Sequence, residues 1–330
     1  MLKQDISVVV QGPVIGGLHV VPARQLTQRC LRSIRRHLPH AEIVLSTWRG
    51  SDVDGLDYDT LVESDDPGAC LQNDSLYVWN NSNRQIVTTN AGLARASGAY
   101  VAKIRSDMLM TGSDWLRYFG RFRARNERWR IVEDRILGCT VFARNPNCRS
   151  SPYPYHPSDW FFFGRKTDLT LLWAIPLQPE PDTSRYFASR PRPFPDCVPS
   201  NLMRYTPEQY LWISFLRKHQ PLTFEHCHDL AHDALGTSEL SIANNLVLLE
   251  PKQLSLRFLK YRIPLHEFPT LYTHGDWLRL YRKYCDPTFK PRVDFTRIRH
   301  RLLQYVYLAP RHALLSTARV LGHRRLSQAR

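Results

Sequence analysis

One short stretch of the chain places several charged side chains around a predicted strand. Residues 100–105 alternate as a strand does, and Ser106 and Asp107 follow directly. Ligands of open α/β sheets gather at the carboxyl ends of strands, so Asp107 is a candidate to hold a metal ion or a phosphate-bearing ligand. Asp also caps turns frequently, and a purely structural role for Asp107 is the alternative.

Two carboxylates further along the chain are candidate bases. Asp159 lies at the start of an apolar strand predicted over 158–164, where partial burial would raise its pKa. Glu208 lies in the first turn of a helix predicted over 207–219, with Thr206 as N-cap. The helix dipole favours the charged form of Glu208, so the presence of an acidic residue in this first turn is also explained by simple charge complementarity with the helix N-terminus. We prefer Asp159 as the base or acceptor contact and place Glu208 second.

A histidine-rich segment has the composition of a metal cluster. Residues 225–229 read Glu-His-Cys-His-Asp, and His232 and Asp233 follow. His226 and His228 would point opposite ways on a strand, whereas His228 and His232 would share one face of a helix. A set of turn and surface residues is the simpler interpretation, and we favour it.

These side chains need a scaffold, and the first third of the chain alternates between strand and helix patterns. The patterns predict strands over 6–10, 42–47, 58–63 and 100–105 and helices over 26–37 and 84–96. Repeated β-α-β units imply a mostly parallel sheet flanked by helices. Further along, residues 141–143 are a predicted strand, and the proline-rich segment 174–207 is predicted to be irregular.

The composition excludes several classes of protein. Hydrophobic residues make up 43% of the 330 residues, which is enough for a sizeable core. No apolar run reaches the roughly eighteen residues that span a bilayer as a helix. The seven cysteines form no Cys-x-x-Cys pair, and neither a G-x-G-x-x-G fingerprint nor a P-loop occurs. The N-terminus lacks the pattern of a signal peptide, from which we expect a cytoplasmic protein.

The net charge of +15 is concentrated near the C-terminus. Residues 279–330 carry thirteen Lys or Arg against two Asp, and cations alternate with apolar and aromatic residues over 296–325. A helix-compatible segment of this kind, broken at Pro310, is typical of helices that lie in a membrane interface. Packing of the apolar face on the chain's own domain is one alternative. Nucleic-acid binding is the other, and we favour it least.

Several short segments of the chain follow one another in a specific order and spacing. They are VVVQGP (8–13), IVLSTW (43–48), DDPG (65–68), NRQIVTT (83–89) with Gly92-Leu93, KIRSD (103–107), SDW (158–160) with Gly164, and EQYLW (208–212). Together they resemble the WavE family of lipopolysaccharide-synthesis proteins, a family associated with glycosyl transfer. The resemblance extends over residues 5–215 and gives the reaction class more firmly than the substrate.

The resemblance implies a GT-A-like fold, in which a nucleotide-sugar lies across the carboxyl ends of the first strands. Gln11, Gly12 and Pro13 would then line the nucleotide end, and an ordinary turn is their alternative explanation. Asp65 or Asp66 would accept a hydrogen bond from the base or ribose, with a solvent-facing Asp-Pro-Gly turn as the alternative.

The diphosphate of such a donor needs positive charge. Arg84 and Lys103 are the implied contacts, with Arg84 preferred because Lys103 could face the other side of its strand. The resemblance also implies an Asp-x-Asp motif, whose last carboxylate binds Mg²⁺ or Mn²⁺. Here the motif reads Arg105-Ser106-Asp107, so an arginine replaces its first carboxylate. Arg105 could itself offset phosphate charge, which would leave a weaker metal site or a metal-independent one.

GT-A enzymes often recruit a late histidine to the metal. The resemblance therefore makes His228 or His274 a possible ligand beside Asp107. One aspartate with the substrate phosphates is enough in principle to hold Mg²⁺.

The sequence thus predicts a glycosyltransferase that moves a sugar from a nucleotide-sugar donor to a lipopolysaccharide or surface-polysaccharide acceptor. We expect a GT-A-like domain over 1–250, with a donor half over 1–110 and an acceptor half over 111–250. A basic helical region over 251–330 would hold the enzyme on the inner face of the cytoplasmic membrane, near a lipid-linked glycan acceptor. The alternatives are a non-catalytic nucleic-acid-binding protein with a basic tail and an inactive GT-A-like scaffold.

Overall fold

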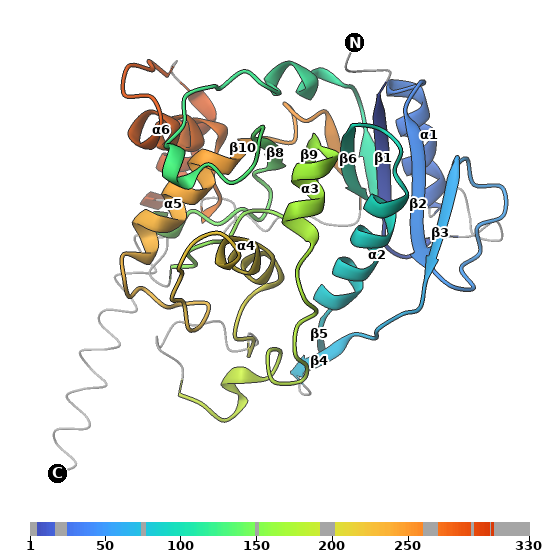
Figure 1. Cartoon of the computed structure of the whole chain (residues 1–330), viewed down its shortest axis with the longest axis horizontal. Coiled ribbons are helices and arrows are strands. Elements are labelled where there is room, and N and C mark those ends of the chain that lie inside the picture. Colours follow the sequence, from blue (N-terminus) through green and yellow to red (C-terminus); the bar gives the residue numbers. More distant parts are fainter. Residues whose placement is uncertain are drawn as a thin grey trace.

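The chain folds around one mostly parallel sheet. The structure, a computed structural model, describes residues 5–16, 25–73, 77–148, 152–191, 202–259, 270–291, 294–303 and 305–306. Seven strands pair in the order β10-β8-β9-β6-β1-β2-β3 (Figure 1). Their bounds are Ile6–Gln11 (β1), Glu42–Trp48 (β2), Thr60–Ser64 (β3), Tyr100–Arg105 (β6), Ile136–Cys139 (β8), Phe161–Arg165 (β9) and Leu246–Leu249 (β10).

Only β9 departs from the parallel arrangement within this sheet. It runs antiparallel to both β6 and β8, whereas the other neighbouring strands are parallel. The predicted α/β fold, a mostly parallel sheet flanked by helices, is confirmed. Two small antiparallel pairs lie outside the sheet: β4 (Cys70–Asn73) with β5 (Val78–Asn80), and β7 (Met108–Met110) with β11 (Leu256–Phe258).

Helices pack on the sheet and at its β10 end. Figure 1 shows α2 and α3 in front of the sheet, while α5 and α6 both contact β10. The α-helices are Leu26–His37 (α1), Ser82–Arg95 (α2), Lys166–Trp173 (α3), Pro207–Arg217 (α4), Ala234–Asn245 (α5) and His274–Tyr284 (α6). Short 3-10 helices cover Asp114–Tyr118, Glu127–Trp129, Pro146–Cys148 and Tyr186–Ala188. No described helix is long and apolar enough to cross a membrane.

One predicted strand is wrong. Residues 141–143 do not form a strand; Val141 and Phe142 lie in a turn, and Phe142 has a φ of +61°. The strand of this region is β8, which ends two residues earlier. Val141 and Ala143 are as well buried as β8 itself, so hydrophobicity continues past the strand and does not mark its end.

The start of α4 is built as the sequence predicts. The Thr206 side chain accepts a hydrogen bond from the Gln209 backbone, and the Gln209 side chain bonds back to Thr206, which completes a capping box. Gln209 Nε2 also donates to the carbonyls of Pro154, at 2.8 Å, and Cys227, at 3.0 Å. Glu208 is therefore placed by a helix end that is tied to two loops.

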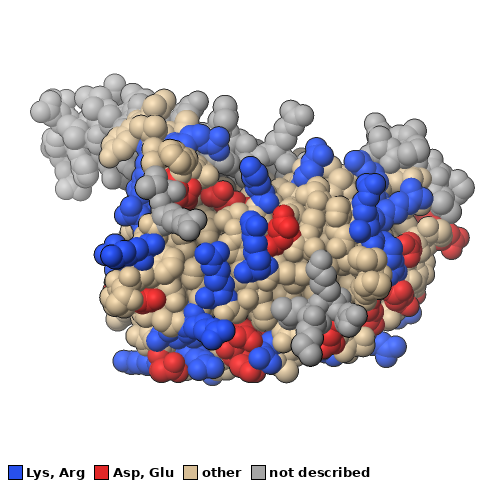
Figure 2. Space-filling model, turned by 90° about the horizontal axis from the view of Figure 1, so that it is seen from above, with Lys and Arg blue, Asp and Glu red and all other residues tan. Residues whose placement is uncertain are grey.

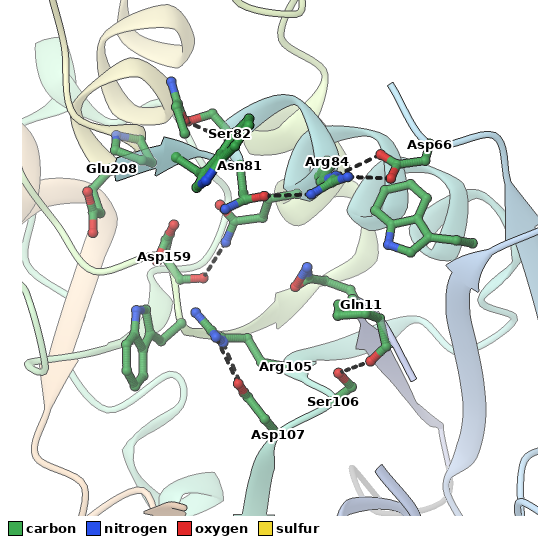
Figure 3. Close-up of a pocket in the computed structure, with 18 of the residues that line it drawn as sticks. Gln11, Asp66, Asn81, Ser82, Arg84, Arg105, Ser106, Asp107, Asp159 and Glu208 are labelled. Atoms are coloured by element: carbon green, nitrogen blue, oxygen red, sulfur yellow. Dashed lines mark hydrogen bonds and ion pairs between the residues drawn. The ribbon is translucent and has the colours of Figure 1, made fainter. Parts of the chain in front are cut away.

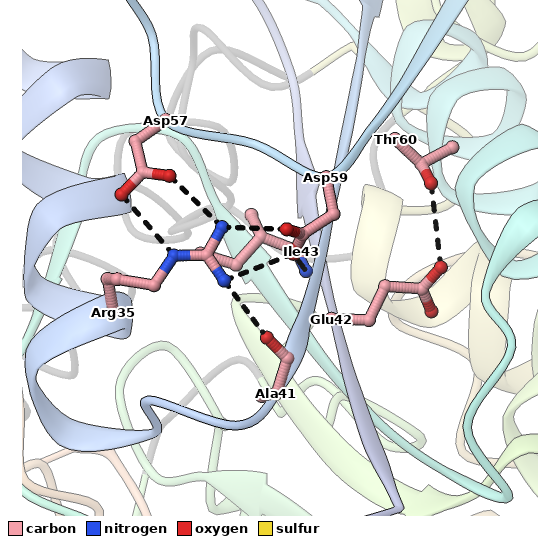
Figure 4. A network of polar contacts seen from close by, with 7 residues as sticks. All are labelled: Arg35, Ala41, Glu42, Ile43, Asp57, Asp59 and Thr60. Carbon is pink, nitrogen blue, oxygen red and sulfur yellow. Dashed lines mark hydrogen bonds and ion pairs between the residues drawn. The ribbon is translucent and has the colours of Figure 1, made fainter.

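A polar network fastens α1 to the edge of the sheet (Figure 4). The Arg35 guanidinium binds Asp57 at 3.1 Å and Asp59 at 3.0 Å. Asp59 also accepts a hydrogen bond of 2.7 Å from the Ile43 backbone N–H in β2. One arginine thus links the end of α1 to β2 and to the segment that enters β3.

The hydrophobic core continues past residue 250. Trp277 and Tyr281 of α6 belong to the same buried cluster as the strands, and Trp277 contacts Phe122 edge-on at 4.7 Å between ring centroids. Leu271 forms a bridge with Arg144. The boundary expected near residue 250 therefore does not separate two hydrophobic cores.

Gly92 lets α2 lie close to the sheet. A Cβ atom at this position would come within 2.4 Å of Val9 Cγ1 in β1 and 3.1 Å of Ser46 Cβ in β2. Both residues are fully buried and belong to central strands, so neither can move aside cheaply. The spacing between α2 and the sheet thus depends on the absence of a side chain.

We expect Gly92→Ala to lower the free energy of unfolding by about 1–3 kcal/mol. The clash would outweigh the gain of about 1 kcal/mol that Ala brings to a helix interior. Chemical denaturation would measure the change, with Ala94→Ser on the exposed face of α2 as the control. A Gly92→Ala protein as stable as the wild type would show that α2 is not in tight contact with β1.

Candidate functional site

A cavity of about 530 Å³ opens at the carboxyl edge of the sheet. Its walls come from segments far apart in the sequence, including the ends of β1, β2 and β6, the start of α2 and the start of α4 (Figure 3). The sequence-predicted residues that line it are Gln11, Gly12, Pro13, Asp66, Arg84, Arg105, Asp107, Asp159 and Glu208.

Strand pairing brings these residues together. β1 and β6 are parallel neighbours with Gln11 opposite Arg105, so both strands end at the same edge. β9 is antiparallel to β6 and pairs Phe161 with Ile104, which places Asp159, two residues before Phe161, just beyond the end of β6. Residues from the first 110 positions and from beyond position 150 therefore meet at one strand end.

The turn after β1 has a defined conformation. Gly12 has a φ of +119°, a backbone conformation that residues with a side chain rarely adopt. A Cβ atom added to Gly12 would lie 3.3 Å from Ser106 Oγ. Ser106 Oγ also donates a hydrogen bond of 2.7 Å to the Pro13 carbonyl. The residue after β6 thus holds the turn after β1 in place.

Gln11 leaves a polar atom available for a ligand. The residue is 7% exposed, and its Oε1 is buried with no hydrogen-bond partner among the described residues. Because a buried acceptor without a partner is costly, a ligand N–H or hydroxyl that reached this atom would gain a full hydrogen bond.

Arg105 and Asp107 form a bidentate ion pair (Figure 3). Arg105 Nε lies 3.0 Å from Asp107 Oδ1 and Arg105 Nη2 lies 2.9 Å from Oδ2. The guanidinium also lies over the Trp160 ring, 4.7 Å from its centroid. The Asp107 side chain is only 5% exposed. Asp107 and Trp160 thus fix the plane of the Arg105 guanidinium at the cavity wall.

This arrangement does not fit a resident Mg²⁺ or Mn²⁺ ion. Both carboxylate oxygens of Asp107 accept hydrogen bonds from the Arg105 guanidinium, so a divalent ion at Asp107 would lie next to that positive charge. Among the described residues no group of three His, Cys, Asp or Glu side chains is placed to hold a metal.

A second ion pair lines the cavity. Arg84 binds Asp66 through Nε at 2.7 Å and Nη2 at 2.5 Å, and its Nη1 reaches Asn81 Oδ1 at 3.0 Å. The hydrogen bond from Arg84 holds the pKa of Asp66 below its usual value. Asp65 points away from the cavity; its side chain is 85% exposed and pairs with Arg49 at 2.8 Å.

Lys103 lies behind the site and does not line the cavity. Its side chain is fully buried, and Nζ donates a hydrogen bond of 2.5 Å to the backbone carbonyl of Asp159. The ammonium also lies 5.1 Å from the Trp173 ring centroid. Burial lowers the pKa of Lys103 to about 7. Lys103 lies on the same face of β6 as Arg105 but two residues deeper in the strand, and it therefore positions the Asp159 segment from beneath the cavity.

Asp159 and Glu208 form the carboxylate pair of the cavity. Burial, reinforced by the negative charge of Asp159, raises the pKa of Glu208 to about 8. Glu208 Oε2 lies 3.5 Å from His156 Nε2, and the Glu208 side chain is 14% exposed. Glu208 therefore favours its protonated form near neutral pH, and both carboxyl groups line the same cavity.

The predicted histidines lie outside the cavity. His228 Nδ1 is 3.2 Å from the Pro152 carbonyl, and its ring packs on Tyr153 at 4.4 Å between centroids. His274 Nδ1 is 2.7 Å from the Leu248 carbonyl, and its ring stacks on Trp277. Neither ring lies at the wall that carries Asp107, because both belong to segments packed elsewhere in the fold.

Several lining residues were not singled out from the sequence. Trp48 ends β2, and Trp79 lies in β5 with 52% of its surface exposed. His156 does not line the cavity but lies behind it, beside Glu208. An indole at a strand end is a signal for stacking on a ring, but aromatic residues are mostly core residues and the pattern is not specific. His156 lies in a loop, where no periodicity indicates what it faces.

The fold and the cavity together define an α/β protein with a polar ligand site at the carboxyl edge of a mostly parallel sheet. The chain belongs to the WavE lipopolysaccharide synthesis family, whose sequence profile matches residues 6–306. The resemblance noted from the sequence is thereby confirmed.

Among solved structures, the chain is similar to a 4-diphosphocytidyl-2C-methyl-D-erythritol synthase from Anaerococcus prevotii DSM 20548. The two share 11% sequence identity and a TM-score of 0.29, over 66% of this chain and 100% of that chain. A TM-score this low carries no argument about function. No curated protein matches the chain.

The raised pKa of Glu208 predicts a pH dependence of stability. The unfolded chain releases this proton near pH 4.5 and the folded chain near pH 8, so the wild type loses stability as pH rises between these values. Relative to the wild type, Glu208→Gln should therefore gain about 1–3 kcal/mol between pH 5 and pH 8.

Denaturation at both pH values would measure this difference. Glu127→Gln, at a carboxylate whose side chain is 78% exposed, is the matched control and should show no such trend. Parallel pH profiles for the wild type and Glu208→Gln would contradict the assignment of the proton to Glu208.

Proposed function

We propose that this protein is a glycosyltransferase that moves a sugar from a nucleotide-sugar donor to a lipopolysaccharide or surface-polysaccharide acceptor. The observation that carries the proposal is the cavity, in which two arginines and a carboxylate pair meet at the carboxyl edge of the sheet. Membership of a lipopolysaccharide-synthesis family supports the class of acceptor.

In this proposal the donor lies across the ends of β1, β2 and β6. The turn at Gly12 lets the nucleoside approach the backbone, and the buried Oε1 of Gln11 accepts a hydrogen bond from it. Trp48 and Trp79 offer flat apolar surfaces for the base. Asp66 and Arg84 lie beside them, close to the ribose and the first phosphate.

Arg105 supplies the positive charge that the leaving diphosphate needs. Its guanidinium is held in plane by Asp107 and Trp160, so little reorganisation is required when charge develops on the phosphate oxygens. A divalent ion would bring the same charge, but the donor set around Asp107 does not fit one. Asp107 is then a positioning residue for Arg105, and the predicted role of Asp107 as metal ligand is replaced.

Asp159 acts as the base. The acceptor hydroxyl gives its proton to the Asp159 carboxylate while its oxygen bonds to the anomeric carbon, and the bond from that carbon to the diphosphate breaks. Protonated Glu208 donates a hydrogen bond to the acceptor or to Asp159, which keeps the pair singly charged.

A thermal-shift screen of nucleoside diphosphates tests the donor site. We expect one of them to stabilise the wild type with EDTA present, and Arg105→Ala to weaken that binding at least about tenfold, because a charge-assisted hydrogen bond is lost. Arg49→Ala, at an exposed arginine outside the cavity, is the matched control.

Two results of the screen would count against the proposal. If no nucleoside diphosphate binds, the donor site is refuted. If binding requires Mn²⁺ and Asp107→Asn loses this Mn²⁺-dependent binding, the ion is part of the site and Arg105 does not replace it.

Removing the base should separate catalysis from binding. Asp159→Asn should lower kcat about 10²–10⁴-fold and leave the nucleoside diphosphate affinity unchanged. Release of nucleoside diphosphate from the donor, with core-truncated lipopolysaccharide as acceptor, would measure the rate. Asp114→Asn, at an exposed aspartate, is the control. Donor binding without turnover in the wild type would instead indicate an inactive scaffold.

A further inference from the structure

The helix that follows α6 turns its apolar face to solvent. Residues 295–303 and 305–306 are helical, and they contain five of the nine large hydrophobic side chains that are exposed among the described residues. Their exposed fractions are 79% for Phe295, 44% for Ile298, 62% for Leu302, 74% for Tyr305 and 64% for Val306. Apolar packing on the chain's own domain, one of the alternatives drawn from the sequence, does not account for these side chains.

These side chains form one narrow stripe with cations at its edges. At roughly 100° per residue, the five positions fall within an arc of about 100°. Arg299 lies at one edge of the arc and Arg301 at the other, while Arg297 and His300 lie on the opposite side. His300 is 4% exposed, so the opposite side is the one that packs on the protein.

Polar contacts hold the helix in this orientation. Arg297 Nε lies 2.9 Å from Asp276 Oδ1 in the first turn of α6, and these side chains are 18% and 9% exposed. Asp294 packs against Gly275, where an added Cβ would come within 2.1 Å of Asp294 Oδ2. Turning the apolar stripe inward would break a mostly buried ion pair, which is strongly unfavourable.

The neighbouring surface is basic. Arg279, Arg282 and Lys283 of α6 line a shallow pocket of about 470 Å³ together with Pro287 and Pro291. Lys283 pairs with Glu239 at 3.0 Å, whereas Arg279 and Arg282 form no ion pair with any described residue. Over 279–306 the chain carries eight Lys or Arg against two Asp. An anionic partner is therefore favoured.

The arrangement of charge favours a membrane over a nucleic acid. Figure 2 shows Lys and Arg side chains as separate groups among other residues on the face it views, without the continuous stripe that a nucleic-acid backbone would follow. A second copy of this chain is disfavoured too, because it would bring the same arginines against each other.

We propose that the face formed by Phe295, Ile298, Leu302, Tyr305 and Val306 docks on an anionic lipid bilayer. The apolar stripe enters the boundary between headgroups and acyl chains, and the flanking arginines meet lipid phosphates. This docking does not depend on the proposed glycosyl transfer.

Vesicle co-sedimentation of the full chain tests the proposal, with phosphatidylcholine vesicles alone and with about one third phosphatidylglycerol. We expect binding to the anionic vesicles, reduced at least tenfold by Phe295→Ser combined with Leu302→Ser. Arg279→Gln combined with Arg282→Gln should reduce binding about tenfold or more, since each cation near an anionic surface contributes about a fivefold effect.

The matched control is Leu177→Ser combined with Leu230→Ser, which removes two exposed leucines elsewhere. It should bind as the wild type does, and every variant should keep the wild-type melting temperature and any shift that a nucleoside diphosphate causes. The proposal is overturned if the wild type does not bind vesicles, or if Phe295→Ser with Leu302→Ser binds equally well. It is also overturned if that variant instead dissolves a dimer seen by sedimentation velocity.

Discussion

The pairing of β6 with β1 on one side and β9 on the other is the constraint on which the site depends. The parallel pair sets Gln11 and Arg105 at one edge of the sheet, and the antiparallel pair brings Asp159 to the same edge. Lys103 reinforces this junction from behind through its hydrogen bond to the Asp159 carbonyl. A shift of one residue in either register would turn the side chains of β6 to the opposite face. The register of these strands therefore determines the geometry of the site.

Electrostatics in the cavity follow from the same geometry. Each arginine of the wall is held by a neighbouring aspartate, Arg84 by Asp66 and Arg105 by Asp107, so the cations are oriented before a ligand arrives. The free-energy cost of partly burying these paired arginines is lower than the cost of burying isolated charges. Glu208 carries its proton because burial and a nearby carboxylate both oppose ionisation. A negatively charged ligand would therefore meet oriented donors and one neutral acid.

Much of this could be predicted from the sequence, and the exceptions have physical causes. Continuous apolar runs identified the central strands because both of their faces are buried, and helical periodicity identified the helices because each buries one stripe. The capping residues marked α4 because capping is local. The strand expected over 141–143 was wrong because buried turns are as apolar as strands. Most of the predicted site residues line the cavity, but Asp65, Lys103 and His228 do not. Asp65 and Asp66 are neighbours in a loop, and Lys103 shares a strand face with Arg105 but lies deeper in β6, so sequence alone does not decide which side chain reaches the cavity.

The sequence by itself determined the α/β class, the family and the chemical types of residue at the site, because these depend on local patterns and on which side chains occur. Tertiary structure decided which of them meet. The Arg105 guanidinium, which pairs with Asp107, also lies over the Trp160 ring, and that ring comes from a segment more than fifty residues away. The outward turn of the helix after α6 likewise depends on the contact between Arg297 and Asp276. Both outcomes rest on contacts between distant segments, and such contacts exist only once the chain has folded.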